Sequence, residues 1–133
     1  MPFADSDEVR DYIGGVFVDA FADTEVGPKL RATGLVLGFV LSDPDTVLVV
    51  DTATGTVGDR ASMPAPTATM TMSADIASAY WQGKVSLPLA MGRRQIKVEG
   101  SVAALLKLAP LSTKLMPAYV QRLEDDGRHD LLV

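Results

Sequence analysis

The stretch that decides the fold is residues 68–76, ATMTMSADI. Its first half alternates apolar residues with threonines, which is the period of a strand that buries one face. Ser73 then offers a hydroxyl oxygen for a helix N-cap, and the apolar residues of 76–81 recur at helical spacing up to Gly83. We therefore predict a half-buried strand that passes directly into an amphipathic helix.

Toward the N-terminus the pattern predicts two helices. Apolar residues over 9–21 recur at helical spacing, and the acidic segment 5–8 before them supplies capping oxygens and a favourable charge for the helix dipole. Pro28 suits the first turn of a short second helix over 29–33. Gly34 ends that helix, because glycine tolerates a positive φ.

The next segment predicts a β-hairpin. Two apolar runs, 35–41 and 46–51, flank the turn sequence Ser-Asp-Pro-Asp and read as antiparallel strands in the middle of a sheet. A further turn leads into a third strand around Val57. Residues 58–66 contain two prolines and several small residues, which indicates a surface loop.

The C-terminal third predicts one more strand and more helix. Residues 95–99 alternate again, and 102–109 are strongly apolar. Helical spacing continues beyond Pro110 and Pro117, so we expect a helical region that the prolines break. With helices at both ends and one inserted before the last strand, the class is α+β with a mostly antiparallel five-stranded sheet in a single domain over residues 1–133.

Composition removes several classes of function. The chain has 133 residues and a net charge of −5, which disfavours nucleic acid as a partner. It contains no cysteine, so disulfides, thiolate catalysis and the usual zinc sites are excluded. No apolar run approaches the roughly 20 residues that span a bilayer, and the acidic start lacks the pattern of a secretion signal. We therefore expect a cytoplasmic protein without a transmembrane segment.

Several segments together carry a resemblance to a known family. Residues 68–76, 81–84 and 92–100 give a strand, a capped helix that ends in Gly-Lys, and a strand of alternating lysines and aliphatics that ends in glycine. The apolar segment 102–108 and the hairpin within 34–57 follow the same order. In this combination the chain resembles the sterol carrier protein type-two family, as a bacterial stand-alone member.

The resemblance implies a sheet covered by helices that enclose an apolar tunnel. Family members bind or transfer a fatty acid, a fatty acyl-CoA or a sterol without converting it, so the resemblance implies neither an enzyme nor a cofactor. The final residues 130–133 lack a peroxisomal tripeptide, unlike the eukaryotic carriers, which puts peroxisomal carriage and sterol as the ligand in doubt.

A lipid site needs an apolar lining and a few polar groups at its mouth. Trp81 can place its ring on lipid and its N–H toward water, and Arg93 and Arg94 can meet a carboxylate or phosphate head group. For the apolar candidates ordinary core packing is the alternative, and for the arginines a solvated turn. The predicted lining is Met70, Met72, Ile76, Tyr80, Trp81, Leu87, Leu89, Met91, Ile96, Val98, Leu105, Leu108, Leu115 and Met116.

No catalytic or metal constellation stands out. His129 has no recognisable base partner or nucleophile, and the spacing of Asp43 and Asp45 is that of a hairpin turn. Gly83-Lys84 lacks the earlier glycine of a phosphate loop. The alternative function is an accessory subunit of a lipid-metabolising enzyme, or a homodimer, which docks through residues 111–123.

Overall fold

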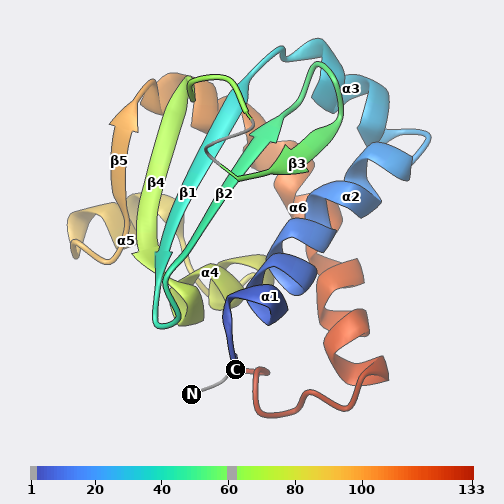
Figure 1. The fold of residues 1–133 in the computed structure, drawn as a ribbon, viewed down its shortest axis with the longest axis vertical. Coiled ribbons are helices and arrows are strands. Elements are labelled where there is room, and N and C mark those ends of the chain that lie inside the picture. Colours follow the sequence, from blue (N-terminus) through green and yellow to red (C-terminus); the bar gives the residue numbers. More distant parts are fainter. Residues whose placement is uncertain (1–2, 60–62) are drawn as a thin grey trace.

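The computed structural model describes residues 3–59 and 63–133 and arranges them as a sheet with flanking helices (Figure 1). The chain passes through helices and strands in mixed order, as expected for an α+β fold. In chain order the elements are α1 (Ser6–Val9), η1 (Arg10–Gly14, π-helical), α2 (Gly15–Ala22), α3 (Val26–Ala32), β1 (Val36–Ser42), β2 (Thr46–Asp51), β3 (Thr56–Gly58), β4 (Ala68–Ser73), α4 (Ala74–Trp81), α5 (Leu87–Gly92), β5 (Lys97–Gly100) and α6 (Val102–Asp125).

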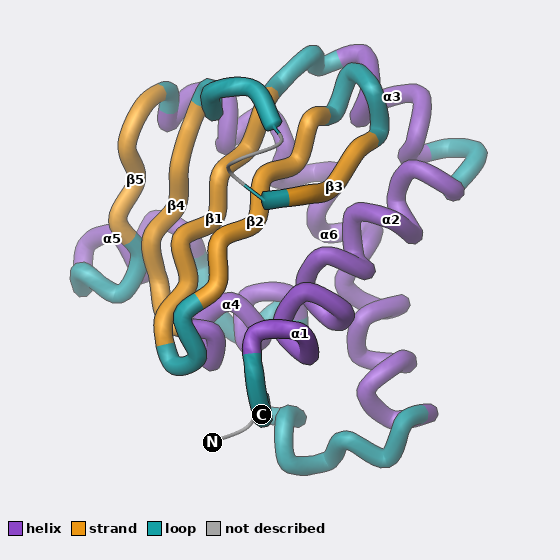
Figure 2. The backbone as a smooth tube through the Cα atoms, in the orientation of Figure 1, coloured by secondary structure: helices purple, strands orange, loops and turns teal. Residues whose placement is uncertain are grey.

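The five strands form one sheet in the order β3-β2-β1-β4-β5. All neighbours are antiparallel except β1 and β4, which run parallel, with Leu37 opposite Ala68. Figure 2 shows α4 and α6 behind this sheet, and the N-terminal helices along its β3 side. The predicted sheet of five mostly antiparallel strands is therefore confirmed, with β1 at its centre and β2 and β4 on either side.

The N-terminal helix begins where its sequence predicts. The side chain of Asp5 accepts a hydrogen bond of 2.9 Å from the backbone N–H of Glu8. Residues 6–22 then stay helical through a π-helical segment at 10–14. The next helix, α3, starts at Val26 rather than at 29, because the Asp23 carboxylate accepts backbone N–H bonds from residues 25 and 26.

Two predictions about the helices were wrong. The C-terminal region is one helix, α6, with Pro110 and Pro117 inside it. The carbonyls that lose their helical donors belong to Leu106 and Thr113, both exposed, so water can satisfy them. In addition, two helices, α4 and α5, lie between β4 and the last strand, β5, where the sequence predicted one. The sequence analysis missed α5, whose six residues are too few to show a helical period.

The core lies between the helices and one face of the sheet. Alternate residues of β1, such as Leu37 and Phe39, and of β2, such as Leu48 and Val50, are almost fully buried there. The opposite face carries threonines and charged residues on β4 and β5. Part of the predicted loop 58–66, residues 60–62, lies outside the described chain.

Candidate functional site

Two small apolar cavities adjoin each other between the sheet and helices α2, α4, α5 and α6. The larger measures about 30 Å³ and the smaller about 10 Å³. We call them together the core pocket. Both are lined by Phe39, Met70, Tyr80, Trp81 and Leu87; Phe17, Leu37, Leu105, Leu108 and Ser112 complete the larger, and Ile13, Met72, Ala77 and Ile96 complete the smaller.

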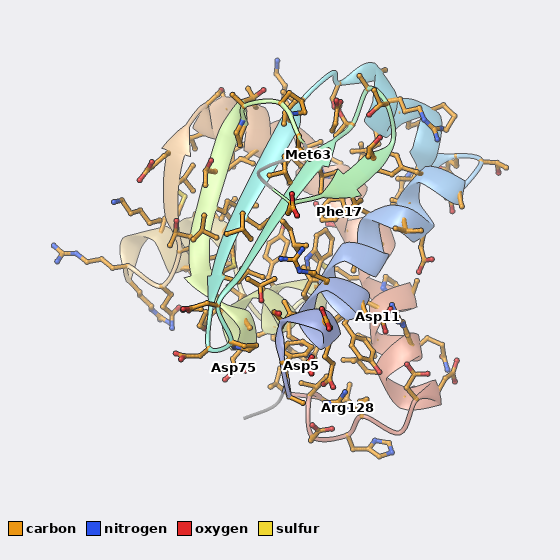
Figure 3. The ribbon with its side chains drawn as sticks, viewed as in Figure 1. Asp5, Asp11, Phe17, Met63, Asp75 and Arg128 are labelled. Atoms are coloured by element: carbon orange, nitrogen blue, oxygen red, sulfur yellow. The ribbon has the colours of Figure 1, made fainter. Side chains whose placement is uncertain are left out.

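An aromatic cluster forms one wall of the core pocket. The Phe17 ring centroid lies 5.5 Å from that of Trp81, edge-on, and 5.4 Å from that of Phe39. Tyr80 meets Trp81 edge-on at 5.2 Å. Figure 3 labels Phe17 on α2, at the side of the sheet where β2 and β3 lie. Such edge-to-face pairs fix ring orientation and give this wall a defined shape.

The segment 68–83 builds much of this site. Met70 on β4 lines both cavities, and the chain turns at Ser73, whose Oγ accepts a 3.1 Å hydrogen bond from the N–H of Ile76. Helix α4 then runs to Trp81, and Gly83 with φ 76° ends the segment. A short helix with defined ends therefore places its last two aromatic residues over the strand that precedes it.

Most of the predicted lining residues meet at this site, but not all of them line it. Ile76, Val98, Leu115 and Met116 pack against the core without lining either cavity. Leu115 borders another small cavity beside Tyr12. The predicted residues that do line the core pocket are Met70, Met72, Tyr80, Trp81, Leu87, Ile96, Leu105 and Leu108.

Four predicted residues lie away from the core pocket. Leu89 on α5 is 61% exposed, and Met91 is half-buried without lining either cavity. Arg93 and Arg94 are exposed at the end of α5. They follow α5 in a turn in which Arg94 has φ 61° and the N–H of Gln95 donates to the carbonyl of Ala90.

The sequence analysis missed several lining residues. Phe17, Leu37 and Phe39 lie in segments that it did predict, but nothing local indicates that these segments face α4. Ser112 is the clearest miss. It follows Leu105 and Leu108 at helical spacing, so a search for polar residues on an apolar helix face would have found it.

Three polar atoms at the core pocket are free to meet a ligand. Among the residues that the structure describes, no partner accepts from the indole N–H of Trp81, and none bonds the hydroxyls of Tyr80 or Ser112. Trp81 is 4% exposed. The indole N–H is nevertheless not sealed from solvent, so water can satisfy it, and a ligand oxygen that reached it would take the place of that water.

A hydrogen-bonded network lies on the other side of α4. The hydroxyls of Ser78 and Tyr119 are 2.8 Å apart, and Gln82 Nε2 donates to Ser78 Oγ at 3.1 Å and to the carbonyl of Leu131 at 2.8 Å. Gln82 Oε1 accepts from the N–H of Val133 at 2.9 Å. Burial raises the pKa of Tyr119 to about 12. We call Ser78, Gln82 and Tyr119 the clamp, because they tie α4 to α6 and the C-terminal tail.

A larger groove of about 520 Å³ lies at the surface between the N-terminal helix and β2 and β3. Arg10, Asp11, Asp19 and Arg122 line it beside glycines and Val18. Arg122 pairs with Asp11 at 3.0 Å and stacks over the ring of Tyr12 at 4.5 Å. Charged walls open to water suit an apolar chain poorly, so the core pocket is the better lipid site.

Neither a catalytic nor a metal site is evident in the part of the chain that the structure describes. No group of three or more potential metal ligands occurs within residues 3–59 and 63–133. His129 is exposed, and its neighbour Asp130 bonds Arg128 instead. Over the same described residues, no helix is long and apolar enough to cross a membrane.

Comparison with solved structures gives the same fold in several proteins. Sterol carrier protein domain 2 of Helicoverpa armigera matches with a TM-score of 0.68 and 21% identity, over 82% of this chain and 88% of that one. Sterol carrier protein 2 of Yarrowia lipolytica matches at 0.64 and 16%, over 84% and 91%. Sterol carrier protein 2 of Aedes aegypti in complex with palmitate matches at 0.54 and 26%, over 80% and 93%.

Sequence comparison agrees with the structural one. No curated protein matches this sequence. The family description of SCP-2 sterol transfer proteins matches residues 17–113, which is well over half of the chain and includes almost all of the core pocket. The resemblance drawn from residues 68–108 and from the hairpin within 34–57 is confirmed, and the chain belongs to the SCP-2 sterol transfer family.

Proposed function

We propose that this protein binds one single-chain lipid, a fatty acid or its acyl ester, in the core pocket and releases it unchanged. The observation that carries the proposal is the pair of adjoining apolar cavities against Trp81, in a member of the SCP-2 family. The palmitate complex of the Aedes aegypti relative, at 26% identity, supports the choice of a fatty acyl chain.

Size decides how binding proceeds. The cavities measure about 30 and 10 Å³, whereas ligand sites occupy about 300 Å³ or more. A lipid chain enters only if the walls move apart. The side chains best suited to this movement are Met70, Leu87, Leu105 and Leu108. They are long and apolar, and their packing contacts are non-directional, so they can change rotamer at small cost. The ligand therefore selects or induces a more open arrangement.

The free polar atoms suggest where the lipid head lies. Ser112, Tyr80 and Trp81 all line the larger cavity and have no partners among the described residues. A carboxyl or ester oxygen placed beside them accepts two or three hydrogen bonds while the chain follows the smaller cavity toward Met72 and Ile96. Arg93 and Arg94, exposed at the end of α5, have no part in this arrangement.

Trp81 is the only tryptophan, so its fluorescence reports on the core pocket directly. Titration with a fatty acid brominated along its chain is expected to quench Trp81 saturably, whereas unbrominated palmitate does not quench it but competes. Bound ligand also raises the melting temperature by mass action. Absence of both quenching and a thermal shift, with palmitate, palmitoyl-CoA and a sterol alike, contradicts the proposal.

A matched pair of variants locates the site. Ser112→Leu fills the larger cavity from α6. It is expected to lower the affinity for the brominated fatty acid, measured by quenching of Trp81, about tenfold or more, because the variant loses both cavity space and a hydroxyl that can bind the lipid head. Thr113→Leu changes the next, exposed residue of α6 and leaves quenching unchanged. Recovery of palmitoyl-CoA intact after incubation tests the absence of catalysis. A folded protein that takes up no lipid favours the accessory-subunit alternative.

A further inference from the structure

Charge is distributed unequally between two parts of the chain. Residues 84–110 carry five cations and one carboxylate, a net charge of +4. The rest of the chain carries seven cations and sixteen carboxylates, a net charge of −9. We call residues 84–110, which comprise α5, β5 and the first turns of α6, the basic end. The overall charge of −5 hides this asymmetry.

Most cations of the basic end are not used inside the protein. Lys97 pairs with Glu99 at 3.4 Å. Lys84, Arg93, Arg94 and Lys107 are exposed, and no described residue forms an ion pair with any of them. By contrast, Lys29, Lys114, Arg122 and Arg128, elsewhere in the chain, pair with carboxylates. Of the other described cations outside the basic end, Arg31 lies over the ring of Phe21 and Arg10 is half-buried, and neither forms an ion pair. Four of the six described cations without an ion pair therefore lie in the basic end.

Exposed leucines accompany these cations. Leu89 on α5 is 61% exposed and Leu106 on α6 is 49% exposed. Two other large apolar residues are comparably exposed within the described chain, Val18 and the terminal Val133, and both lie in the acidic remainder. Figure 2 shows α5 beside β5 at one side of the molecule, and the first turns of α6 behind the same strands, away from the N-terminal helices.

The basic end is also a wall of the core pocket. Leu87 is the first residue of α5, and Leu105 and Leu108 flank the exposed pair Leu106 and Lys107 on α6. Movement of this wall, which the proposed function requires, opens the cavity toward whatever surface the basic end contacts.

We propose that the basic end docks on an anionic lipid bilayer and that lipid passes between the bilayer and the core pocket there. The docking rests on the proposed function. Cations that lie beside exposed leucines suit a bilayer surface, because the leucines enter the acyl boundary while long basic side chains reach the phosphates. The acidic remainder is repelled by the same surface, so the molecule binds in one orientation.

Sedimentation with phosphatidylcholine vesicles, with or without about one third phosphatidylglycerol, tests the docking. We expect binding only to the anionic vesicles, and weakening as added salt shortens the Debye length from about 10 Å to about 3 Å. Arg93→Gln combined with Lys107→Gln is expected to lower the affinity about tenfold or more. The control, Lys29→Gln with Lys114→Gln, makes the same change of net charge at the other end and leaves binding within about twofold.

A second pair of variants separates a bilayer from an acidic protein. Leu106→Ser is expected to weaken vesicle binding several-fold, whereas Val18→Ser, at a comparably exposed residue, leaves it unchanged. Equal binding to neutral and anionic vesicles, or equal losses in both charge variants, overturns the proposal. Binding to soluble polyglutamate as tight as to vesicles, and indifferent to Leu106→Ser, also overturns it, in favour of an acidic protein.

The two proposals fail separately. Quenching of Trp81 by brominated fatty acid is measured without vesicles, and vesicle sedimentation without fatty acid. A protein that binds anionic vesicles through the basic end but takes up no fatty acid refutes the proposed function alone. A protein that takes up fatty acid but ignores vesicles refutes the docking alone.

Discussion

The two ends of helix α6 are held in different ways. From 102 to 113, its side chains line the core pocket and make no hydrogen bond to another element among the described residues. From Tyr119 onward, α6 and the tail are tied down by the clamp, by the pair between Arg122 and Asp11, and by the hydrogen bond from the Tyr12 hydroxyl to Asp126. Figure 3 shows the tail residue Arg128, which pairs with Glu8, below the start of α1.

This difference suits the opening that the proposed lipid binding requires, because the pocket can widen without unfolding the rest of the chain. Apolar contacts are non-directional, so side chains at the pocket end can repack around a ligand at small cost. Hydrogen bonds between buried groups tolerate little displacement, so the clamped end keeps the fold in register. We expect local opening to start at the pocket end.

The largest loss of stability is expected from a substitution at the end of α6 that the clamp holds. Leu123 is completely buried, and Leu123→Ala is expected to lower the free energy of unfolding by about 4 kcal/mol. Leu108→Ala, at the pocket end of the same helix, removes the same atoms but is expected to lower it by only about 2 kcal/mol, because that site collapses more easily. Urea unfolding measures both, and Leu108→Ala should also admit bulkier lipids. Equal losses would contradict the comparison.

A smaller effect is expected when the clamp loses its amide. Gln82→Ala removes three hydrogen bonds and leaves the Leu131 carbonyl without its donor, which is expected to destabilise the fold by about 2 kcal/mol. Lipid affinity should stay unchanged, because Gln82 does not line the core pocket. Gln121→Ala, an exposed change on α6, serves as the control. A loss of affinity in Gln82→Ala would show that the two ends are coupled.

The phenol of Tyr119 links the clamp to pH. Below pH 10 it is protonated in both the folded and the unfolded chain, so its contribution to stability is constant. Its folded pKa is raised to about 12, so between pH 10 and about 12 the unfolded chain loses the proton first and stability falls as pH rises. Tyr119→Phe should cost about 1 kcal/mol at neutral pH and make this alkaline fall shallower. Unfolding curves at several alkaline pH values check the slope, and an unchanged slope assigns it to other groups.

Local patterns predicted most of the fold, and the reason is physical. Segments such as 68–83 carry their own alternation, cap and stop, and the structure has each of them where the sequence places it. The predictions that were wrong concern features that depend on contacts between residues far apart in the sequence. Pro110 and Pro117 break an isolated helix, but burial of Leu105, Leu108 and Leu123 keeps α6 continuous.

The site was harder to predict than the fold for the same reason. Alternation and helical period identify which residues turn inward, and eight of those named do line the core pocket. They do not identify which inward residues border a cavity, because that depends on how α2, α5 and α6 cross. Phe17 and Ser112 come from such crossings. Leu89 was misplaced because its short helix turns it outward.

The smallest expected effect concerns backbone strain in the turn that follows α5. Arg94 occupies the left-handed region, φ 61°, in a turn after α5 that favours glycine. Arg94→Gly relieves about 1 kcal/mol of strain, and the freer unfolded chain cancels about half of this. We therefore expect the free energy of unfolding, measured by denaturant titration, to rise by about 0.5 kcal/mol. Arg93→Gly, one residue earlier at φ −89°, relieves no strain and should lose stability. If both variants change the free energy of unfolding alike, the turn is not strained at Arg94.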